Sequence, residues 1–244
     1  MRNSLLIAYG NWLFHWRDKV FPPVMLALFL GFTPGLFGGD LASDRVLDAV
    51  GFGVALLGQA FRWLVIGLAY IKRGGLNKRV YAADLVTEGL FSHVRNPLYV
   101  GNLLILAGLF IVHHGTGVYL VGGVNFLLAY IAIVAAEEHY LRGKFGEAYE
   151  RYCADVPRWL PRFAGLGETL RSMRFNWQRA LLKDSGSCFM WMLCALLIMA
   201  IEAYRNGGGA ALAARGDILL LAVIVLVATL ATLVLLRKRG VLKP

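Results

Sequence analysis

The residues best suited to chemistry lie where a polar loop meets an apolar segment, in the stretch SHVRNPLYVGNLL (residues 92–104). Arg95 supplies a permanent cation there and Tyr99 supplies a hydroxyl group. Asn96 is a favoured N-cap, and Pro97 suits the first position of a helix, where its missing N–H costs nothing. Helix initiation therefore explains the Asn-Pro pair. Arg95 and Tyr99 remain open to two interpretations, a binding site or an anchor at a membrane interface.

Two adjacent acids, Glu137 and Glu138, end the apolar stretch that follows. If this stretch folds back on itself as a helical hairpin, its antiparallel arms return the acids to the neighbourhood of Arg95 and Tyr99. Glu138 can pair with Arg142 at an i,i+4 spacing, which is worth about 0.3–0.5 kcal/mol. That pair leaves Glu137 unexplained. The sequence therefore predicts a site where the basic start and the acidic end of the hairpin meet.

The composition is that of a membrane protein. Of the 244 residues, 58% are hydrophobic and only 16% are charged, and the mean hydropathy is +0.61. A soluble domain carries about 25% charged residues. The net charge of +10 could indicate nucleic-acid binding, but the Lys and Arg residues fall in blocks between apolar segments, which is the pattern of membrane loops. The three cysteines form no CxxC motif, so neither disulfides nor a metal site is predicted.

The apolar segments predict an all-α fold, a polytopic bundle of about six transmembrane helices. A spanning helix needs about 20 mostly apolar residues. The candidates are 20–37, 49–71, 98–136 taken as two helices, 188–204 and 218–236. The third candidate is interrupted by the turn HHGTG and forms the hairpin. Its first arm, 98–112, has a length of about 22 Å at 1.5 Å per residue, which is shorter than the ~30 Å hydrocarbon core. The hairpin can therefore enter the membrane without fully crossing it.

The basic residues predict the orientation. All but four of the 25 Lys and Arg residues lie in segments 1–19, 72–97, 137–187 and 237–244. An excess of basic residues marks cytoplasmic loops. We therefore expect an integral protein of a bacterial inner membrane, with both termini and Arg95 at the cytoplasmic face.

Two of these basic stretches, 137–153 and 163–182, predict helices that lie on the membrane surface. In both, apolar side chains recur at helical spacing. In the second, an apolar stripe lies opposite Arg171, Arg174 and Arg179. Such a stripe is typical of an interfacial helix on anionic lipid, and packing against a neighbouring helix explains it equally well.

A longer series of motifs accompanies the hairpin. It comprises Thr87 and Gly89; Arg95, Asn96, Pro97, Tyr99 and Gly101; Glu137, Glu138 and Leu141; Phe145, Gly146, Tyr149 and Tyr152; and Val156, Arg158 and Pro161. In order and spacing, the stretch from residue 85 to residue 161 resembles the integral-membrane methyltransferases that include isoprenylcysteine carboxyl methyltransferase and bacterial phospholipid methyltransferases. Each piece is weak alone, and the series together is specific.

The resemblance implies an S-adenosylmethionine-dependent methyltransferase with a lipophilic acceptor, such as a phospholipid or a prenyl-tailed molecule, and without a metal. It implies cofactor binding by Thr87, Gly89, Arg95, Asn96, Pro97, Tyr99, Gly101, Glu137, Glu138, Tyr149 and Tyr152. It implies catalytic roles for Arg95, Glu137, Glu138 and Arg158. The start of the hairpin would also offer free N–H groups to a carboxylate of the cofactor. Gly101 would either admit the cofactor or permit tight helix packing.

The same resemblance divides the chain into three parts. Residues 1–84 would form N-terminal membrane helices, and residues 85–163 the methyltransferase hairpin with its cofactor-binding segment. Residues 164–244 would form an amphipathic linker helix and two further membrane helices, outside the resemblance.

The expected reaction is an in-line displacement in which an acceptor oxygen or nitrogen attacks the sulfonium methyl group. A carboxylate acceptor would need only a cation to hold it, such as Arg158 or Arg95. An amine acceptor would have to lose a proton, which Glu137 or Glu138 could accept. The sequence leaves both acceptors open.

Arg62 is a charge inside a predicted span. It shares a helix face with Gln59, about 15 Å from the end of the span. A charge at such depth costs about 2.5–3.5 kcal/mol, so a partner or an aqueous cavity is expected. A role in an acceptor cavity and a structural hydrogen-bonding role are both consistent with its position.

Two other classes of protein fit parts of the pattern. An NADPH-dependent membrane reductase of the sterol-reductase type resembles this architecture, but its hairpin motif differs at Leu98 and Asn102. A non-enzymatic membrane protein would bind no cofactor. A metal site built from His93, His139 and the glutamates lacks regular ligand spacing.

Overall fold

Helices dominate the structure, a computed structural model that describes residues 2–35, 40–68, 73–76 and 79–242. The helices are α1 (Arg2–Gly31), α2 (Leu41–Leu68), α3 (Pro97–His113), α4 (Gly123–Phe145), α5 (Glu147–Asp155), α6 (Leu166–Ser172) and α7 (Trp177–Lys238). A 3₁₀ turn η2 (Gly89–Ser92) precedes α3, and a π-helical turn η3 (Val118–Gly122) leads into α4. Strands β1 (Arg73–Leu76) and β2 (Arg79–Ala82) pair in a small antiparallel hairpin. The predicted all-α membrane bundle is confirmed.

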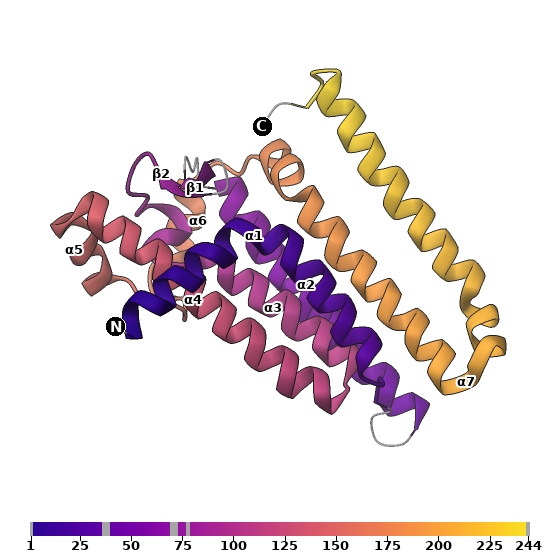
Figure 1. Ribbon diagram of the computed structural model, residues 1–244. Coiled ribbons are helices and arrows are strands. Elements are labelled where there is room, and N and C mark those ends of the chain that lie inside the picture. Colours follow the sequence, from indigo (N-terminus) through magenta and orange to yellow (C-terminus); the bar gives the residue numbers. More distant parts are fainter. Residues whose placement is uncertain (1, 36–39, 69–72, 77–78, 243–244) are drawn as a thin grey trace.

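The bundle is built from two helix pairs and a covering helix. In Figure 1, α2 runs along α3 and α1 runs along α4, while the first half of α7 lies across this group. The β-hairpin, α5 and α6 gather at one end of the bundle. We call this the Arg95 end, because α3 begins there. The second half of α7 lies outside the first half, away from the other helices.

Glycines bring α2 and α3 into close contact. A Cβ atom on Gly51 would lie 2.8 Å from the Gly108 carbonyl oxygen, and a Cβ on Gly58 would lie 2.7 Å from that of Gly101. A Cβ on Gly101 would in turn lie 2.5 Å from Cγ of Arg62. Small residues let helix backbones approach closely in membranes. Gly101 therefore faces α2 and serves helix packing.

The described residues contain three helices long and apolar enough to cross a membrane, Ser43–Leu68, Val118–Phe145 and Trp177–Lys238. Pro97–His113 is a shorter apolar helix, as expected for the first arm of the hairpin.

The first helix begins earlier than predicted. We expected a span from residue 20 to residue 37, whereas α1 covers Arg2–Gly31, and residues 36–37 lie outside the described part. The start is helical because it packs on α4. A Cβ on Gly10 would lie only 2.0 Å from the Ala132 carbonyl oxygen, and Leu13 and Phe14 are buried.

The predicted surface helix 163–182 is wrong, because the chain breaks between α6 and α7. The Asn176 side chain accepts a hydrogen bond from the Arg179 N–H at 2.9 Å and so caps α7. The Asn176 N–H donates to the Gly67 carbonyl at 2.8 Å, and the Phe175 ring lies where a Cβ of Gly67 would be. These contacts hold the break against α2. Beyond it, α7 runs to a kink at Gly208, where φ is 66° and ψ is −162°.

The predicted helix 137–153 is also divided. Gly146, with φ of 50° and ψ of −126°, separates α4 from α5. Leu141, Tyr149 and Tyr152 are buried together with Val156. This stripe therefore packs inside the protein, which was one of the two interpretations of the pattern.

Candidate functional site

The two ends of the hairpin meet at the Arg95 end of the bundle. The Tyr99 hydroxyl donates a hydrogen bond to Oε1 of Glu137 at 2.7 Å. Nη1 of Arg95 lies 3.6 Å from Oε1 of Glu138. These pairs form because α3 begins at Pro97 and the antiparallel α4 carries both glutamates back to that level. The expected meeting of a basic start and an acidic end is thus present in the structure.

Glu138 is the centre of a cluster of arginines. Its carboxylate is almost fully buried and pairs with the Arg158 guanidinium, whose Nε lies 2.9 Å from Oε1 and whose Nη2 bonds Oε2. Arg142 approaches the same carboxylate at 3.8 Å, and Arg95 lies 3.6 Å from it. The carboxylate is thus engaged by three arginines. The structure thus gives Glu138 and Arg158 the role of joining the hairpin to the segment after α5.

His93 fastens the same segment from the other side. Its Nδ1 lies 2.7 Å from the Arg162 carbonyl oxygen, and its Nε2 lies 2.9 Å from Oγ1 of Thr169. The Arg162 N–H donates to the His93 carbonyl, and the Arg95 N–H donates to the Pro157 carbonyl, both at 2.9 Å. With both ring nitrogens engaged, His93 is not placed to ligate a metal, and His139 is exposed.

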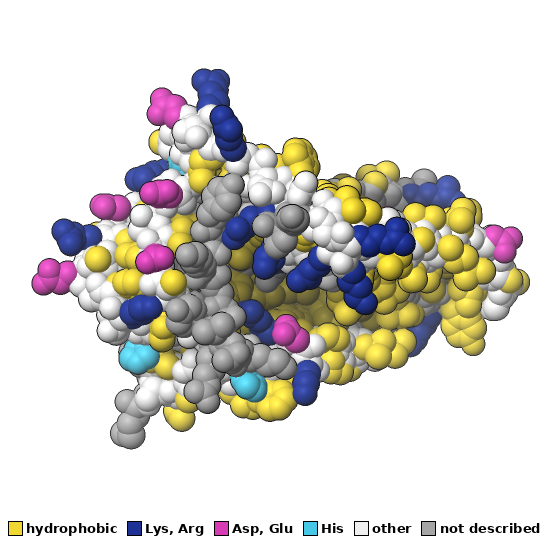
Figure 2. Space-filling model, turned by 90° about the horizontal axis from the view of Figure 1, so that it is seen from above, with side chains coloured by type: hydrophobic (Ala, Val, Ile, Leu, Met, Phe, Trp, Pro, Cys, Tyr) yellow, Lys and Arg dark blue, Asp and Glu magenta, His cyan; other side chains and the backbone are white. Residues whose placement is uncertain are grey.

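A cavity of about 530 Å³ opens beside the hairpin start. Five of the predicted site residues lie on its wall: Arg95, Asn96, Pro97, Tyr99 and Glu137. Apolar side chains of α1, α3 and α7 form most of the remaining surface. Figure 2 shows a hollow floored by hydrophobic side chains and bordered by several Lys or Arg residues. The cavity thus combines charged groups at one end with an apolar interior.

The sequence reasoning missed the contribution of α1. Arg17 lines the cavity, and its Nη1 donates to the Tyr99 hydroxyl at 3.3 Å, which extends the Tyr99–Glu137 contact into a chain of three groups. Phe14 and Phe21 of the same helix form part of the wall. The available signal was the position of Arg17 immediately before the predicted first span.

The sequence reasoning also missed the partner of Arg62. The buried carboxylate of Asp184 accepts hydrogen bonds from Nε of Arg62 at 3.1 Å and from its Nη2. The same carboxylate accepts from Nε2 of Gln59 at 2.6 Å, and the Trp191 indole N–H donates to Oε1 of Gln59 at 2.8 Å. Arg62 also bonds the Asn102 side chain and lines the cavity. The structural hydrogen-bonding interpretation of Arg62 is therefore confirmed, and its position on the cavity wall leaves a role in an acceptor cavity as a prediction.

Seven predicted site residues lie away from the cavity lining, the five described here and the two tyrosines of the next paragraph. Thr87 is exposed, Gly89 adopts a φ of 61° beside Met173, and Glu138 and Arg158 form the cluster described above. Gly101 faces α2.

Tyr149 and Tyr152 are buried behind the cavity. The Tyr152 hydroxyl donates to the Phe91 carbonyl at 2.7 Å, and Phe91 lines the cavity. Tyr152 therefore holds the cavity wall from outside.

The donor set suits S-adenosylmethionine. Nε of Arg95 is buried and has no hydrogen-bond partner among the described residues, so it can receive an anionic group such as a carboxylate. Glu137 places a carboxylate on the cavity wall, where it can balance a sulfonium charge or accept from ribose hydroxyls. Phe14 and Phe91 supply aromatic rings for a base.

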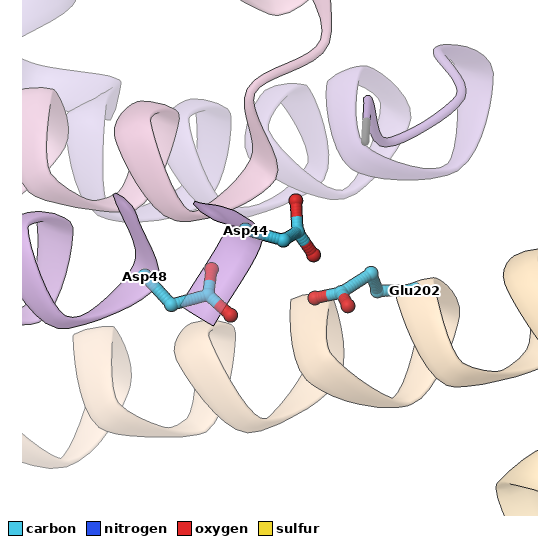
Figure 3. A group of neighbouring side chains, drawn as sticks. All are labelled: Asp44, Asp48 and Glu202. Carbon is cyan, nitrogen blue, oxygen red and sulfur yellow. The ribbon is translucent and has the colours of Figure 1, made fainter. Parts of the chain in front are cut away.

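A separate group of acids lies toward the other end of the bundle. Asp44 and Asp48 of α2 and Glu202 of α7 have carboxylate oxygens within 4.8 Å of one another. Figure 3 shows the three side chains pointing toward one another from the two helices. His114 pairs with Asp44 at 2.7 Å, and Arg215 lies 3.8 Å from Glu202. The Arg215 guanidinium partly offsets the acidic charge, and the sequence reasoning had not singled the group out.

Comparison with known proteins identifies the family of this chain. A bundle of apolar helices with a bent hairpin and a charged cavity at its start is the architecture of an integral-membrane protein with a candidate ligand site. The family model for phospholipid methyltransferase matches residues 49–148. The chain belongs to the integral-membrane methyltransferase family that includes phospholipid and isoprenylcysteine methyltransferases. No solved structure is a significant match.

Three curated relatives were found. The chain is 36% identical over 159 residues to the cobalt-zinc-cadmium resistance protein CzcN of Cupriavidus metallidurans, covering 64% of this chain and 69% of the relative. It is 27% identical to the protein-S-isoprenylcysteine O-methyltransferase of Schizosaccharomyces pombe, covering 56% of this chain and 66% of the relative. It is 31% identical over 83 residues to the nickel-cobalt-cadmium resistance protein NccN of Alcaligenes xylosoxydans xylosoxydans, covering 34% and 38%.

Proposed function

We propose that this protein transfers a methyl group from S-adenosylmethionine to a lipophilic acceptor in the cavity beside Arg95 and Glu137, at the cytoplasmic face of the membrane. Its membership of a membrane methyltransferase family supports the reaction class. One observation carries the assignment of the site. Nε of Arg95 is buried at the cavity without a partner in the described chain, while a carboxylate, Glu137, lies on the wall of the same cavity.

The cofactor supplies an electrophilic methyl carbon on a sulfonium. The acceptor atom forms a bond to that carbon, the carbon–sulfur bond breaks, and its electron pair stays on sulfur, which becomes a neutral thioether. The protein aligns the reactants, and alignment can contribute about 7–11 kcal/mol in well-oriented systems. Arg95 and the N-terminus of α3 would hold the cofactor's carboxylate, and Glu137 would lie near the positive charge.

Glu137 is also the better placed base. Its carboxylate is held by the Tyr99 hydroxyl, which Arg17 contacts in turn, whereas Glu138 is occupied by arginines. An amine acceptor would lose its proton to Glu137. A carboxylate acceptor would need no base and would bind beside Arg17.

The test is a calorimetric titration of the purified full-length protein with S-adenosylhomocysteine and, separately, with NADPH. We expect binding of the first, and a loss of about tenfold or more in affinity in Arg95→Ala, because a charge-assisted hydrogen bond is worth about 1.5–3 kcal/mol. Arg237→Ala, at the far end of α7, is the matched control. Binding of NADPH alone would transfer the assignment to the reductase class, and binding of neither would remove the enzymatic proposal.

A further inference from the structure

The cavity is charged at one end and apolar along its depth. Its charged groups include Arg95 and Glu137, and its lining continues along α3 from Tyr99 to Leu109. Ten residues of helix rise about 15 Å, roughly half of the ~30 Å hydrocarbon core. A volume of about 530 Å³ is in the range of a site for one small molecule. The apolar part of the cavity therefore has about the depth of one membrane leaflet.

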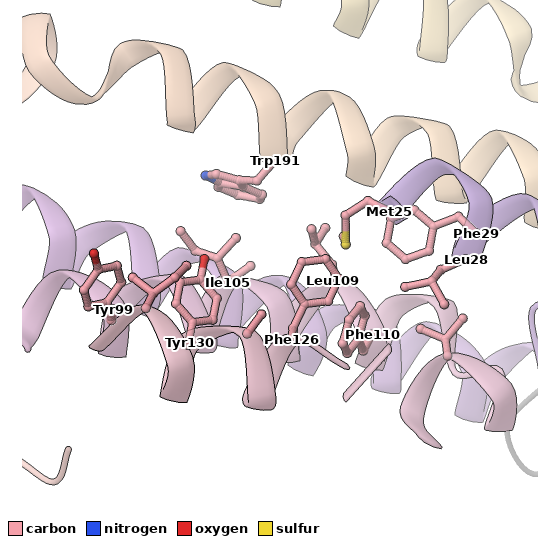
Figure 4. Close-up of a cluster of buried hydrophobic side chains, with 14 of the residues drawn as sticks. Met25, Leu28, Phe29, Tyr99, Ile105, Leu109, Phe110, Phe126, Tyr130 and Trp191 are labelled. Carbon is pink, nitrogen blue, oxygen red and sulfur yellow. The ribbon is translucent and has the colours of Figure 1, made fainter. Parts of the chain in front are cut away.

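Trp191 forms the α7 side of the apolar part. It is buried and lines the cavity. Figure 4 shows its indole projecting from α7 toward the side chains of Ile105 and Leu109. Met190 and Cys194 of the same helix continue this wall. An apolar chain that enters from the charged end therefore meets Trp191 within the cavity.

The orientation of Trp191 is held by the polar network of α2 and α7. Its indole N–H donates to Gln59, Gln59 donates to Asp184, and Asp184 binds the Arg62 guanidinium. Rotation of the indole would leave a buried N–H and a buried carbonyl oxygen without partners, which is unfavourable. The ring is thus a fixed part of the wall.

We propose that Trp191 limits the length of the single apolar chain that the acceptor places in the cavity, and that Gln59, Asp184 and Arg62 position it. The proposal rests on the proposed function, since the head of the acceptor must lie at the Arg95 end for its chain to reach Trp191. The wall comes from α7, which lies outside residues 49–148, the part that matches the family model. Acceptor selection is thereby assigned to a segment added to the family's shared hairpin.

The test uses lysophosphatidylethanolamines with decanoyl, dodecanoyl, tetradecanoyl and hexadecanoyl chains. Bound lipid is measured on the purified full-length protein by native mass spectrometry. Affinity in the wild type rises with chain length to a limit and then falls. Trp191→Ala moves this limit to longer chains and raises the ratio of hexadecanoyl to dodecanoyl affinity by about tenfold or more.

Three further variants test whether the ring of Trp191 and its hydrogen-bonded network set the chain-length limit. Trp191→Phe keeps a large ring but loses the N–H that binds Gln59, so its chain-length limit lies between those of the wild type and Trp191→Ala. Trp177→Ala removes a tryptophan of the same helix that is 66% exposed and changes nothing. Asp184→Asn, which weakens the hold on Gln59 and Arg62, broadens the preference among chain lengths.

Cysteine modification gives a second readout that leaves Trp191 intact. With Cys153 and Cys188 replaced by serine, a bound chain protects Cys194, on the cavity wall, from N-ethylmaleimide. Cys188 lies on the same helix but outside the cavity lining. In a second variant, in which Cys188 is the one cysteine retained, a bound chain does not protect it from N-ethylmaleimide.

The proposal is overturned if folded Trp191→Ala has the same chain-length limit as the wild type. It is also overturned if bound lipid protects Cys188 and Cys194 equally from N-ethylmaleimide, or if the wild type binds none of the four lysophosphatidylethanolamines. S-adenosylhomocysteine is titrated into the same samples. If it binds normally while the limit does not move, only this inference fails. If it does not bind to the wild type, the proposed methyl transfer fails, and the chain-length result still decides the role of Trp191.

Discussion

At the scale of single residues, Glu137 and Glu138 show how one position along a helix changes the environment of a carboxylate. Side chains of consecutive helical residues point about 100° apart. Glu137 therefore reaches the cavity and Tyr99, while Glu138 is buried among arginines. The first faces the cavity in which we propose that the cofactor binds, and the second joins the hairpin to the segment after α5.

Exchanging each acid for its amide separates these roles. Glu138→Gln should lower the free energy of unfolding by about 1–3 kcal/mol, because Arg158 and Arg95 lose their shared charge partner and Arg158 is partly exposed. Glu137→Gln should leave stability nearly unchanged and weaken S-adenosylhomocysteine binding. Thermal unfolding in detergent and calorimetry measure the two effects. Equal stability losses in both variants would contradict this division.

At the scale of elements, close helix packing and one buried ion pair hold the cavity walls together. The glycines at the α2–α3 contact let these two helices touch along their backbones. The Arg62–Asp184 pair fastens α7 to α2. Neither contact is catalytic, yet both determine where the side chains of the cavity stand.

The glycine contact predicts that Gly51→Val destabilises the protein by about 1–3 kcal/mol, because a larger side chain would collide with the Gly108 carbonyl. Gly53→Val is the matched control, since nothing lies within 4 Å of a Cβ at that position and the change in helix propensity is the same. Thermal unfolding of both variants checks this expectation. A comparable loss in the control would attribute the effect to propensity instead of packing.

The Arg62–Asp184 ion pair predicts that a single substitution destabilises the protein more than a double one. Asp184→Ala should cost about 3–5 kcal/mol, because it leaves the Arg62 guanidinium buried without its acid. Replacing both residues, with Arg62→Met and Asp184→Leu, should restore most of this loss, since apolar side chains of similar volume often substitute well for a buried pair. Denaturant unfolding of the three variants tests the coupling. A double variant less stable than Asp184→Ala would refute it.

At the scale of the whole molecule, the sequence predicts orientation through its basic segments. If the Arg95 end is cytoplasmic, the region of the Gly208 kink must lie outside. We expect Gly209→Cys, in a background without native cysteines, to react with a membrane-impermeant maleimide in intact cells. Gly167→Cys in α6 should react only after permeabilisation. The reverse pattern would invert the proposed topology.

The sequence predicted the hairpin and its meeting of charges because those depend on local patterns and on antiparallel return. It also predicted that Arg62 has a partner or lies at an aqueous cavity. It did not identify Asp184, Arg17 or Trp191, because their places in the site follow from how α1 and α7 pack across the hairpin. The sequence also did not predict the end of the helix before Asn176. Contacts with Gly67 hold the chain there, and no strong helix breaker occurs in that segment.

The kink at Gly208 has a consequence for how the protein meets bilayers of different thickness. Beyond the kink, α7 has few contacts with the rest of the protein. Only 6% of the most apolar 18-residue segment of this helix is buried, so lipid surrounds it on most sides. Such a helix can tilt to match the local hydrocarbon thickness, at a cost of about a fraction of a kcal/mol per Å of hydrophobic mismatch. The kink at Gly208 separates this second half of α7 from the first half, which carries Trp191. A change in the tilt of the second half therefore need not deform the cavity.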